Sequence, residues 1–581
     1  MRRGRVLATA TVGAMVAAGI TSLGATASAT PASGAASGQQ SSYVVLAEAG
    51  ASASTIASEL TAQGARVTSV NAAIGLITVN SADSDFSKSA KDLDGVQGVA
   101  SNISIGAAPQ APAAPDVVEE EHKLAGARAG QAVTGAAAAD GADPLDTYLW
   151  GMDMIKAPEA HQTQKGDPGV TVGILDTGVQ GDHPDLAANF DAARSRNFTT
   201  DIVGIDGACE YAGCKDPADV DDNGHGTHVA GTIGAALDGF GLSGVAPDVT
   251  LVNIRGGQDS GYFFLGPVTN ALTYAGDTGI DVVNMSFYVD PWLYNCTGGA
   301  PEDSAPAAAD QEVIIEGMNR ALQYAHAHGV TLVGALGNNH EDLSNPRTDY
   351  SSPDYDNPAL SWDDSAYART ISDKTCVDLP VEGPHVIGVS ALGPSERKSD
   401  FSNYATKLHS GEIEVSAPGG WFRDGIGTAT YRTNGNLILS TAPLHVLQAE
   451  GAVNKAGKIT REGEAAGVMK QCKESGGTTV CGYYQWLQGT SMAAPHATGV
   501  AALAVSAHGV ADTANGGLTL DPDQVRALLM GTATDHACPA GGVQSYTDVG
   551  RSGEFTATCV GTPDFNAFYG AGIVNALGVV Q

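Results

Sequence analysis

The sequence predicts an α/β fold with a mostly parallel central sheet over residues 146–581, preceded by a small α+β domain over residues 41–106. Apolar runs bounded by glycine, such as VTVGILDTG at 170–178, are typical of strands buried on both faces, as in parallel sheets. Residues 41–106 instead follow the order strand–helix–strand–helix–strand, which suits a small α+β domain. The chain is 43% hydrophobic, enough to form sizeable cores.

The charge of the chain is strongly negative. The 581 residues include 30 Lys and Arg against 64 Asp and Glu, so the formal net charge is 30 − 64 = −34. Nucleic-acid binding requires clustered Lys and Arg, and anionic membrane surfaces attract basic segments. The composition therefore argues against both kinds of partner. The 74 glycines and 26 prolines indicate many tight turns.

Residues 1–29 have the organisation of a signal peptide. A basic start with Arg2, Arg3 and Arg5 precedes an apolar stretch over 6–23, and Ala27-Ser28-Ala29 supplies the small residues that a signal peptidase needs. A transmembrane anchor is the alternative, but Thr and Gly interrupt this stretch and no second apolar span of about 20 residues follows. We therefore predict a secreted protein without a membrane anchor.

The next segments read in order as linker, small domain and linker. Residues 30–40 are small and polar, as in flexible linkers. Strands are expected at 42–46, 73–80 and 99–105, with helices at 53–64 and in the polar run DSDFSKSAKDLDGV. Residues 107–145 are rich in Ala, Pro and Gly without periodicity, so we predict a disordered linker that is open to proteolysis.

All eight cysteines follow residue 145, and their even number in an exported chain favours disulfides. Eight cysteines allow 105 pairings. A zinc site is the competing interpretation, but no Cys-x2-Cys pair exists. Short loops favour three pairs and leave a fourth: Cys209–Cys214, Cys472–Cys481, Cys538–Cys559 and Cys296–Cys376.

Three motifs carry residues suited to catalysis. Asp176 follows the strand at 170–175, at the end that faces the functional crevice in open α/β sheets, although a turn or cap role is the simpler interpretation. His225 opens the helix-like run HGTHVAGTIG, which Asp222 or Asn223 can cap. His225 and His228 could ligate a metal, but a general base paired with Asp176 explains the pattern better. Glycines in this run predict close backbone packing.

Ser491 lies in the third motif, QGTSMAAPHATGVAALA at 488–504. Gly489 permits a tight entry into a helix of small residues that includes Pro495. A serine at a helix start is usually a cap. It can also be a nucleophile whose developing oxyanion faces free backbone N–H groups and the positive end of the helix dipole.

Taken together, DTG around Asp176, HGTHVAG from His225 and GTSMAAPH around Ser491 resemble the three signatures of subtilisin-like serine peptidases, the subtilases of peptidase family S8. The chain order Asp–His–Ser is that of subtilisin. The resemblance covers 146–581 and implies a three-layer αβα catalytic domain. Residues 41–106 resemble the I9-like propeptide of this family, which implies an intramolecular chaperone and inhibitor that is cleaved off later.

The resemblance also implies further site residues. Asn338, after the strand-like run VTLVGALGNN, matches the oxyanion-hole asparagine, which acts with the Ser491 amide; a Gly-Asn turn is the alternative. An extended substrate is implied to lie between two segments. The chain has Phe287-Tyr288-Val289 where the family usually has Leu-Gly-Gly, so the resemblance does not carry over a side-chain preference. The implied substrate-binding residues are Ser260, Gly261, Tyr262, Ser286 and Phe287.

Structural calcium is the implied cofactor. Asp185 in the segment HPDL matches a family calcium ligand, and Asp238 lies in the matching loop LDGFG; Asp185 as a turn cap is the alternative. Oxygen ligands of this kind suit Ca²⁺. The surplus of carboxylates is compatible with cation binding without identifying a site.

Four insertions enlarge the predicted catalytic domain, and their composition predicts surface loops held by disulfides. The last one ends at Trp486, close to Ser491, where it can shape the cleft. We predict a monomeric, secreted endopeptidase made as a zymogen that acts on protein or peptide substrates. An exopeptidase of the same fold and an inactive extracellular binding scaffold are the alternatives. The insertions are 203–220, 290–312, 340–382 and 444–486.

Overall fold

The structure is a computed structural model that describes residues 41–101, 141–353 and 366–581. The predicted signal peptide, the linker 30–40 and residues 107–140 of the second linker lie outside the described residues. The last residues assigned to that linker are part of the fold: Asp143 is buried, and the backbone N–H of Leu145 donates to the Gly241 carbonyl at 2.8 Å. The folded region after the linker therefore starts before residue 146.

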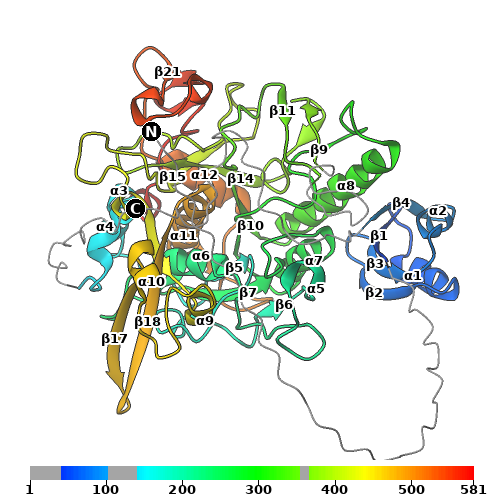
Figure 1. The fold of residues 1–581 in the computed structure, drawn as a ribbon, viewed down its shortest axis with the longest axis horizontal. Coiled ribbons are helices and arrows are strands. Elements are labelled where there is room, and N and C mark those ends of the chain that lie inside the picture. Colours follow the sequence, from blue (N-terminus) through cyan, green and yellow to red (C-terminus); the bar gives the residue numbers. More distant parts are fainter. Residues whose placement is uncertain (1–40, 102–140, 354–365) are drawn as a thin grey trace, which may run out of the picture. The chain divides into compact units, whose positions relative to one another are not determined.

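A seven-stranded sheet forms the centre of the large domain (Figure 1). Its strand order is β15-β14-β10-β8-β5-β7-β6, and every neighbouring pair is parallel. This arrangement confirms the predicted α/β class with a parallel central sheet. The strands are β5 (Thr171–Leu175), β6 (Arg196–Asn197), β7 (Thr250–Arg255), β8 (Val282–Met285), β10 (Thr331–Ala335), β14 (Val386–Leu392) and β15 (Val415–Pro418).

Helices cover both faces of this sheet. Val172 and Ile174 of β5 pack into the cluster formed by α6 (His225–Gly234), α11 (Thr490–His508) and α12 (Pro522–Thr532). Leu175 packs on the opposite face with α7 (Leu265–Asp277) and α8 (Ala305–Ala327). Because successive side chains of a strand point to opposite faces, an uninterrupted apolar strand is what a sheet covered on both sides requires.

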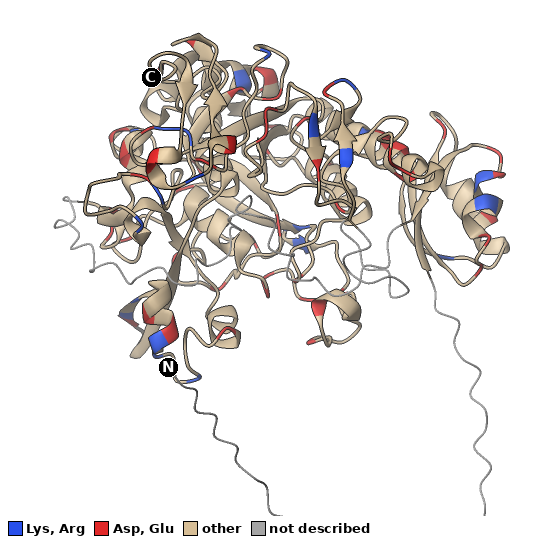
Figure 2. Cartoon of the chain, turned by 45° about the horizontal axis from the view of Figure 1, so that its top comes forward, with Lys and Arg blue, Asp and Glu red and all other residues tan. Residues whose placement is uncertain are grey.

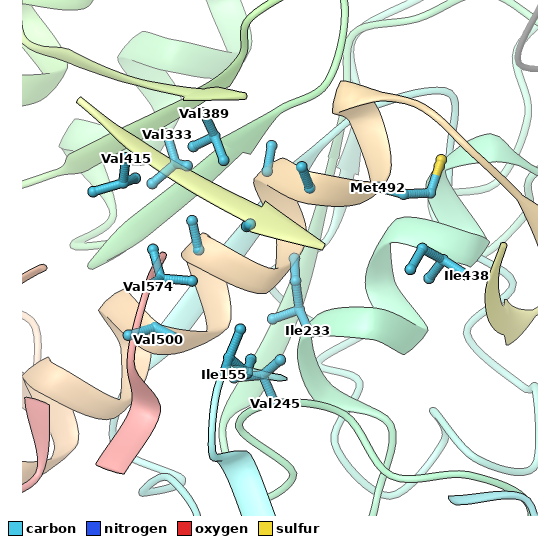
Figure 3. Close-up of a cluster of buried hydrophobic side chains, with 14 of the residues drawn as sticks. Ile155, Ile233, Val245, Val333, Val389, Val415, Ile438, Met492, Val500 and Val574 are labelled. Atoms are coloured by element: carbon cyan, nitrogen blue, oxygen red, sulfur yellow. The ribbon is translucent and has the colours of Figure 1, made fainter. Parts of the chain in front are cut away.

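The core on the α6/α11 face is packed from several elements (Figure 3). Val333, Val389 and Val415 come from three neighbouring strands and belong to the same buried cluster as Val500 of α11, and all four are fully buried. The predicted close packing of the α6 glycines is confirmed. A Cβ on Gly226 would lie 2.1 Å from the Gly178 carbonyl oxygen, which no side chain could accommodate.

The small N-terminal domain has one strand more than expected. Its order is β1–α1–β2–β3–α2–β4, and its sheet is antiparallel in the order β2-β3-β1-β4. The additional strand, β2, is formed by RVTSVN. Its exposed and partly buried residues alternate, and this pattern alone is too weak to predict a strand from the sequence. The expected strand at 99–105 begins earlier, at Val96, and its residues 102–105 lie outside the described residues. The elements are β1 (Ser41–Ala47), α1 (Ala53–Ala62), β2 (Arg66–Asn71), β3 (Leu76–Ser81), α2 (Phe86–Lys91) and β4 (Val96–Ser101).

All four predicted disulfides are confirmed: Cys209–Cys214, Cys296–Cys376, Cys472–Cys481 and Cys538–Cys559. No cysteine of the described chain is free, which removes the zinc alternative for these residues. Cys296–Cys376 joins β9 (Asn295–Cys296) to β13 (Cys376–Val377) and so connects two insertions.

The insertion 444–486 is folded, which corrects the expectation of a surface loop. It forms two short helices and a long hairpin, shown in gold in Figure 1, which pairs with β16 (Ile438–Thr441) in a three-stranded antiparallel sheet. Leu447, Val453 and Tyr483 form part of its own apolar cluster, and burial of that cluster explains why the segment is ordered. The elements are α9 (Leu444–Ala449), α10 (Arg461–Ala466), β17 (Met469–Ser475) and β18 (Thr478–Leu487).

Shorter elements complete the large domain. Asp and Glu positions are spread over many of its loops and helices (Figure 2). None of the helices in the described ranges has the length and apolar run needed to cross a membrane. The remaining helices and strands are α3 (Trp150–Met154), α4 (Ala157–Ala160), α5 (Val203–Asp206), α13 (Ala576–Val579), β11 (Arg347–Asp349), β12 (Arg369–Ile371), β19 (Val510–Ala511), β20 (Leu518–Thr519), β21 (Val543–Gln544), β22 (Ala557–Thr558), β23 (Gly561–Thr562) and β24 (Phe565–Asn566).

Candidate active site

Asp176 and Ser286 lie side by side at the carboxyl edge of the sheet. Each directly follows its strand, and β5 and β8 pair in parallel with Leu175 opposite Met285. Asp176 is fully buried, and its Oδ1 accepts the backbone N–H of Thr177 at 2.8 Å. The parallel register therefore delivers a buried carboxylate to the end of the sheet where loops form functional sites.

His225 is the first residue of α6, and its Nδ1 lies 2.7 Å from Oδ1 of Asp176. The imidazole is only 7% exposed. A carboxylate at this distance favours the tautomer with the proton on Nδ1, which leaves Nε2 as the basic nitrogen. The two groups thus form the pair that a histidine general base requires.

The segment before α6 is held by Asp221, a residue that sequence reasoning did not select. Its Oδ1 accepts the N–H of Gly224 at 2.8 Å, and its Oδ2 accepts the N–H of Thr227 at 2.9 Å. Asn223, one of the predicted caps, accepts the His225 N–H at 3.2 Å, whereas Asp222 does not cap the helix and instead pairs with His445. The start of α6 is therefore fixed relative to Asp176 by side-chain hydrogen bonds.

Ser491 lies in the first turn of α11, where backbone N–H groups have no intrahelical acceptor. The helix is entered through Gly489, whose φ of 155° is open to glycine but rarely to other residues. Ser491 and Ser286 bond reciprocally: Ser491 Oγ donates to the Ser286 carbonyl at 3.2 Å, and Ser286 Oγ donates to the Ser491 carbonyl at 3.1 Å. Because Ser286 adjoins Asp176 and α11 packs against α6, the residues of the three motifs gather at one edge.

Asn338 follows β10, and its amide is oriented by Thr490. Oδ1 of Asn338 accepts the Thr490 N–H at 2.8 Å and the Thr490 hydroxyl at 2.9 Å, so Nδ2 is the donor end of the side chain. The Thr490 hydroxyl also accepts the Gly337 N–H at 3.0 Å. Thr490 is not among the predicted site residues, because the sequence motif was interpreted through Ser491 alone. The arrangement joins Asn338 to the residue immediately before the candidate nucleophile.

The predicted substrate-binding residues fall into two groups. Ser286 reaches Ser491 directly, whereas Ser260, Gly261 and Tyr262 form a turn: the Gly261 N–H donates to the Gln258 carbonyl at 3.0 Å. The Ser260 N–H donates to Asp206 Oδ1 at 3.0 Å. These two N–H groups are therefore used inside the protein in this conformation, which differs from an open edge strand offering them to a substrate.

Aromatic stacking connects the two groups. The rings of Phe263 and Phe287 stack with their centroids 4.0 Å apart, and the Phe263 N–H donates to Asp290 Oδ2 at 2.6 Å. The segment 257–263 is thus tied to the segment 286–290 beside Ser491. The Phe287 ring, two residues after the end of β8, is therefore packed directly on Phe263.

The candidate calcium ligands lie around the loop 237–242. Asp185 is buried, its Oδ2 accepts the Leu242 N–H at 3.1 Å, and burial raises its pKa to about 8, with the charges of Asp143 and Asp238 adding to the rise. Asp143, which sequence reasoning placed in the linker, accepts the Gly239 N–H at 2.6 Å on Oδ1, while its buried Oδ2 has no hydrogen-bond partner. Asp238 instead pairs with Lys473 at 3.0 Å. The buried oxygens without hydrogen-bond partners, Asp143 Oδ2 and Asp185 Oδ1, are ligands of the kind that a hard cation takes, and Asp238 lies close enough for its charge to raise the pKa of both carboxyl groups.

The insertion 444–486 borders the histidine motif. His445 Nε2 lies 2.9 Å from the Asp221 carbonyl oxygen and 3.0 Å from Asp222 Oδ1, and the hydrogen bond to Asp222 raises the His445 pKa. This contact lies only a few residues before His225. The insertion therefore borders the candidate active site on the side of the His225 motif.

A parallel sheet with this Asp, His and Ser arrangement at its carboxyl edge has the architecture of a subtilisin-like peptidase. The Subtilase family profile of peptidase family S8 matches residues 167–572, well over half of the chain, and the chain therefore belongs to the subtilase family. The resemblance drawn from the three motifs is confirmed, and membership implies serine-type peptidase chemistry.

Individual relatives agree with this assignment. Fervidolysin from Fervidobacterium pennivorans is 28% identical over 408 residues, which is 68% of this chain but only 42% of fervidolysin. Thermitase from Thermoactinomyces vulgaris is 26% identical over 328 residues, which is 56% of this chain and 89% of thermitase. Among solved structures, the epidermin leader peptide processing serine protease from Staphylococcus aureus shares the fold, with a TM-score of 0.58, 18% identity and coverage of 93% of this chain and 98% of that chain.

Proposed function

We propose that this chain is a secreted serine endopeptidase, made as a zymogen, that uses Asp176, His225 and Ser491 as a catalytic triad. The observation that carries the proposal is the 2.7 Å contact between His225 Nδ1 and Asp176 Oδ1 beside a helix that begins at the Ser491 motif. Membership of the subtilase family supports serine-type chemistry on protein or peptide substrates.

The reaction follows from the roles of these groups. His225 Nε2 takes the proton of Ser491 Oγ as the oxygen attacks the scissile carbonyl, and Asp176 stabilises the imidazolium that forms. Asn338 Nδ2 and the Ser491 N–H donate to the oxyanion of the tetrahedral intermediate. The imidazolium then protonates the leaving amine, and water hydrolyses the acyl-enzyme with His225 again acting as base.

The direct test is labelling of matured protein with a fluorophosphonate probe. We expect Ser491 to be labelled and the label to be absent from a Ser491→Ala variant. Well-folded protein that stays unlabelled would contradict the triad and favour an inactive binding scaffold.

An exopeptidase is the second candidate, and the insertion contact from His445 to Asp221 is the observation that favours it, because a walled cleft can exclude long substrates. Peptides blocked at both ends and cleaved internally distinguish the two activities. We expect internal cleavage; release of only short terminal peptides would favour the exopeptidase.

The zymogen proposal rests on contacts between the N-terminal domain and helices α7 and α8. Arg320 of α8 donates to the carbonyl oxygens of Ala47 at 2.9 Å and Ile74 at 3.0 Å. Asn71 donates to Thr273 Oγ1 of α7 at 2.9 Å. A domain bound through several such contacts can act as an intramolecular chaperone and inhibitor. We expect autocleavage within residues 107–145 that Ser491→Ala abolishes.

Export and calcium complete the proposal. The signal-like residues 1–29 and four disulfides support secretion, since disulfides persist in oxidising compartments.

Asp143 and Asp185 are the residues that would bind Ca²⁺ beside the loop 237–242, and their carboxylates would neutralise its charge. Bound at 100 times its Kd, an ion stabilises a protein by about 2.7 kcal/mol. We expect excess chelator to lower Tm, and Asp143→Asn to remove that response; an unchanged Tm would contradict the site.

A further inference from the structure

The position of the substrate side chain before the scissile bond, P1, follows from the proposed site. The P1 carbonyl must lie within reach of both Ser491 Oγ and the Asn338 amide, so the P1 side chain leaves its Cα beside the exits of β8 and β10. These strands are parallel neighbours, with Met285 opposite Gly334. The exit segments 286–289 and 336–338 therefore flank the P1 side chain.

Asp378 lies against both segments. Its Oδ2 is 3.4 Å from the position that a Cβ on Gly337 would occupy, next to Asn338. The residue after it, Leu379, accepts the N–H of Val289 at 2.8 Å through its carbonyl oxygen. The segment that begins at Asp378 thus crosses from one wall of the P1 position to the other.

The Asp378 carboxylate is buried without a counter-charge of its own. The residue is 3% exposed, and Oδ1 has no hydrogen-bond partner. Burial raises the pKa of Asp378 well above its usual range, the charge of Glu382 raises it further, and Arg347 lowers it only in part. An unpartnered carboxylate in such a place is costly unless a ligand supplies the missing cation.

Among the described residues, Arg347 is the cation whose charge acts on Asp378, but its guanidinium makes no hydrogen bond to that carboxylate, since Nε and Nη2 have no hydrogen-bond partner. Its Nη1 donates to the Leu343 carbonyl at 2.8 Å, and its Nη2 lies 3.8 Å from Glu382 Oε2. The guanidinium also stacks 4.1 Å above the Tyr294 ring. The single charge of Arg347 acts to lower the pKa of Glu341, Asp378 and Glu382 alike, so three carboxyl groups share one cation.

We propose that Asp378 makes the enzyme select a basic P1 residue, Arg or Lys, whose cationic end pairs with the Asp378 carboxylate. The inference rests on the proposed peptidase function and names its substrate class. An extended Arg or Lys side chain delivers a charge several ångströms from its backbone, which a carboxylate at the far end of the P1 position can meet. Neutral P1 side chains leave the carboxylate unpaired.

The test uses matured full enzyme and blocked peptide nitroanilides that differ only at P1: Arg, citrulline, Lys and Phe. Citrulline matches Arg in shape without its charge. We expect kcat/KM for Arg to exceed that for citrulline at least 100-fold. Asp378→Asn should bring this ratio below 5-fold through loss on Arg while cleavage after Phe is retained, and the exposed Asp535→Asn should leave it unchanged.

Two inhibitors that differ only at P1 test the same preference without a protein variant. A peptide aldehyde ending in arginal should inhibit at least 100-fold better than one ending in phenylalaninal. Equal inhibition, or equal cleavage after Arg and citrulline, by enzyme that a fluorophosphonate labels at Ser491 overturns the Asp378 assignment alone. Folded enzyme that takes no label and cleaves none of the substrates overturns the proposed function together with it.

Discussion

Nδ1 of His225 and Oδ1 of Asp176 lie 2.7 Å apart, in a contact buried between β5 and α6. The strand supplies a carboxylate at its end and the helix supplies an imidazole at its start, so the geometry depends on how closely the two elements approach. Gly226 allows that approach, since its missing Cβ leaves room for the Gly178 carbonyl.

Asp176→Asn is expected to lower kcat about 10⁴-fold, because the amide stabilises the wrong imidazole tautomer. KM should change little, since Asp176 does not touch the substrate. The variant is matured in trans by wild-type enzyme, and kcat is measured on a peptide nitroanilide. Asp182→Asn, an exposed carboxylate in the same region, is the control; equal rates for the two variants would argue against the triad.

Asn338→Ala should lower kcat about 10²–10³-fold through loss of one oxyanion donor. Thr490→Val removes the hydroxyl that holds Asn338 Oδ1 at 2.9 Å and should cause a smaller loss of kcat. Thr490→Ser, which keeps the hydroxyl, is the matched control. A Thr490→Val enzyme as active as Thr490→Ser would show that the hydroxyl does not orient the amide.

Loss of the Cys296–Cys376 disulfide should destabilise the protein more than loss of Cys472–Cys481. The first closes a loop with a sequence separation of 80, the second one of 9. In the chain-entropy description these loops correspond to about 4.5 and 2.5 kcal/mol. Paired Cys→Ser variants in a Ser491→Ala background, unfolded in urea, measure both; the reverse order would contradict the entropic argument.

The buried Lys398 is expected to make the stability of the folded protein depend on pH. Burial lowers its pKa to about 7 from an ordinary value of 10.5. Between these values the unfolded chain holds a proton that the folded chain lacks, so stability from this group rises with pH, by up to about 1.4 kcal/mol per pH unit. The free energy of unfolding of Ser491→Ala protein minus that of its Lys398→Met derivative should therefore increase from pH 7 to 10. A flat difference would mean that Lys398 stays charged in the fold.

Arg320 should anchor the N-terminal domain on the peptidase domain. It donates to the carbonyls of Ala47 and Ile74 and, at 2.6 Å, to Gln97 Oε1. Hydrogen bonds to charged groups contribute roughly 1.5–3 kcal/mol, so Arg320→Ala should weaken inhibition by added residues 41–101 about 10- to 100-fold. Arg320→Lys, which keeps the charge and one donor group, should lie between wild type and Ala. An unchanged inhibition constant would place the binding energy elsewhere.

Local pattern predicted much of this protein. Buried parallel strands are continuous apolar runs that can be recognised in the sequence. The residues that follow two of them, Asp176 and Asn338, therefore lie at the carboxyl edge of the sheet. The disulfides were also predictable, because three of them close short loops and one pair then remains. The chain order of the three motifs, Asp–His–Ser, by itself indicated the subtilase family.

Tertiary structure alone decided the features that join distant segments. Strand β2 exists because β3 offers it a partner, and the hairpin β17–β18 is ordered because β16 and an apolar cluster cover it. Asp143 reads as linker in the sequence, yet it reaches the loop 237–242 nearly 100 residues away. Asp378 likewise meets Gly337 only through the folded chain. A sequence pattern reports the conformation and burial of a short segment, whereas pairing and charge balance depend on which segments the fold brings together.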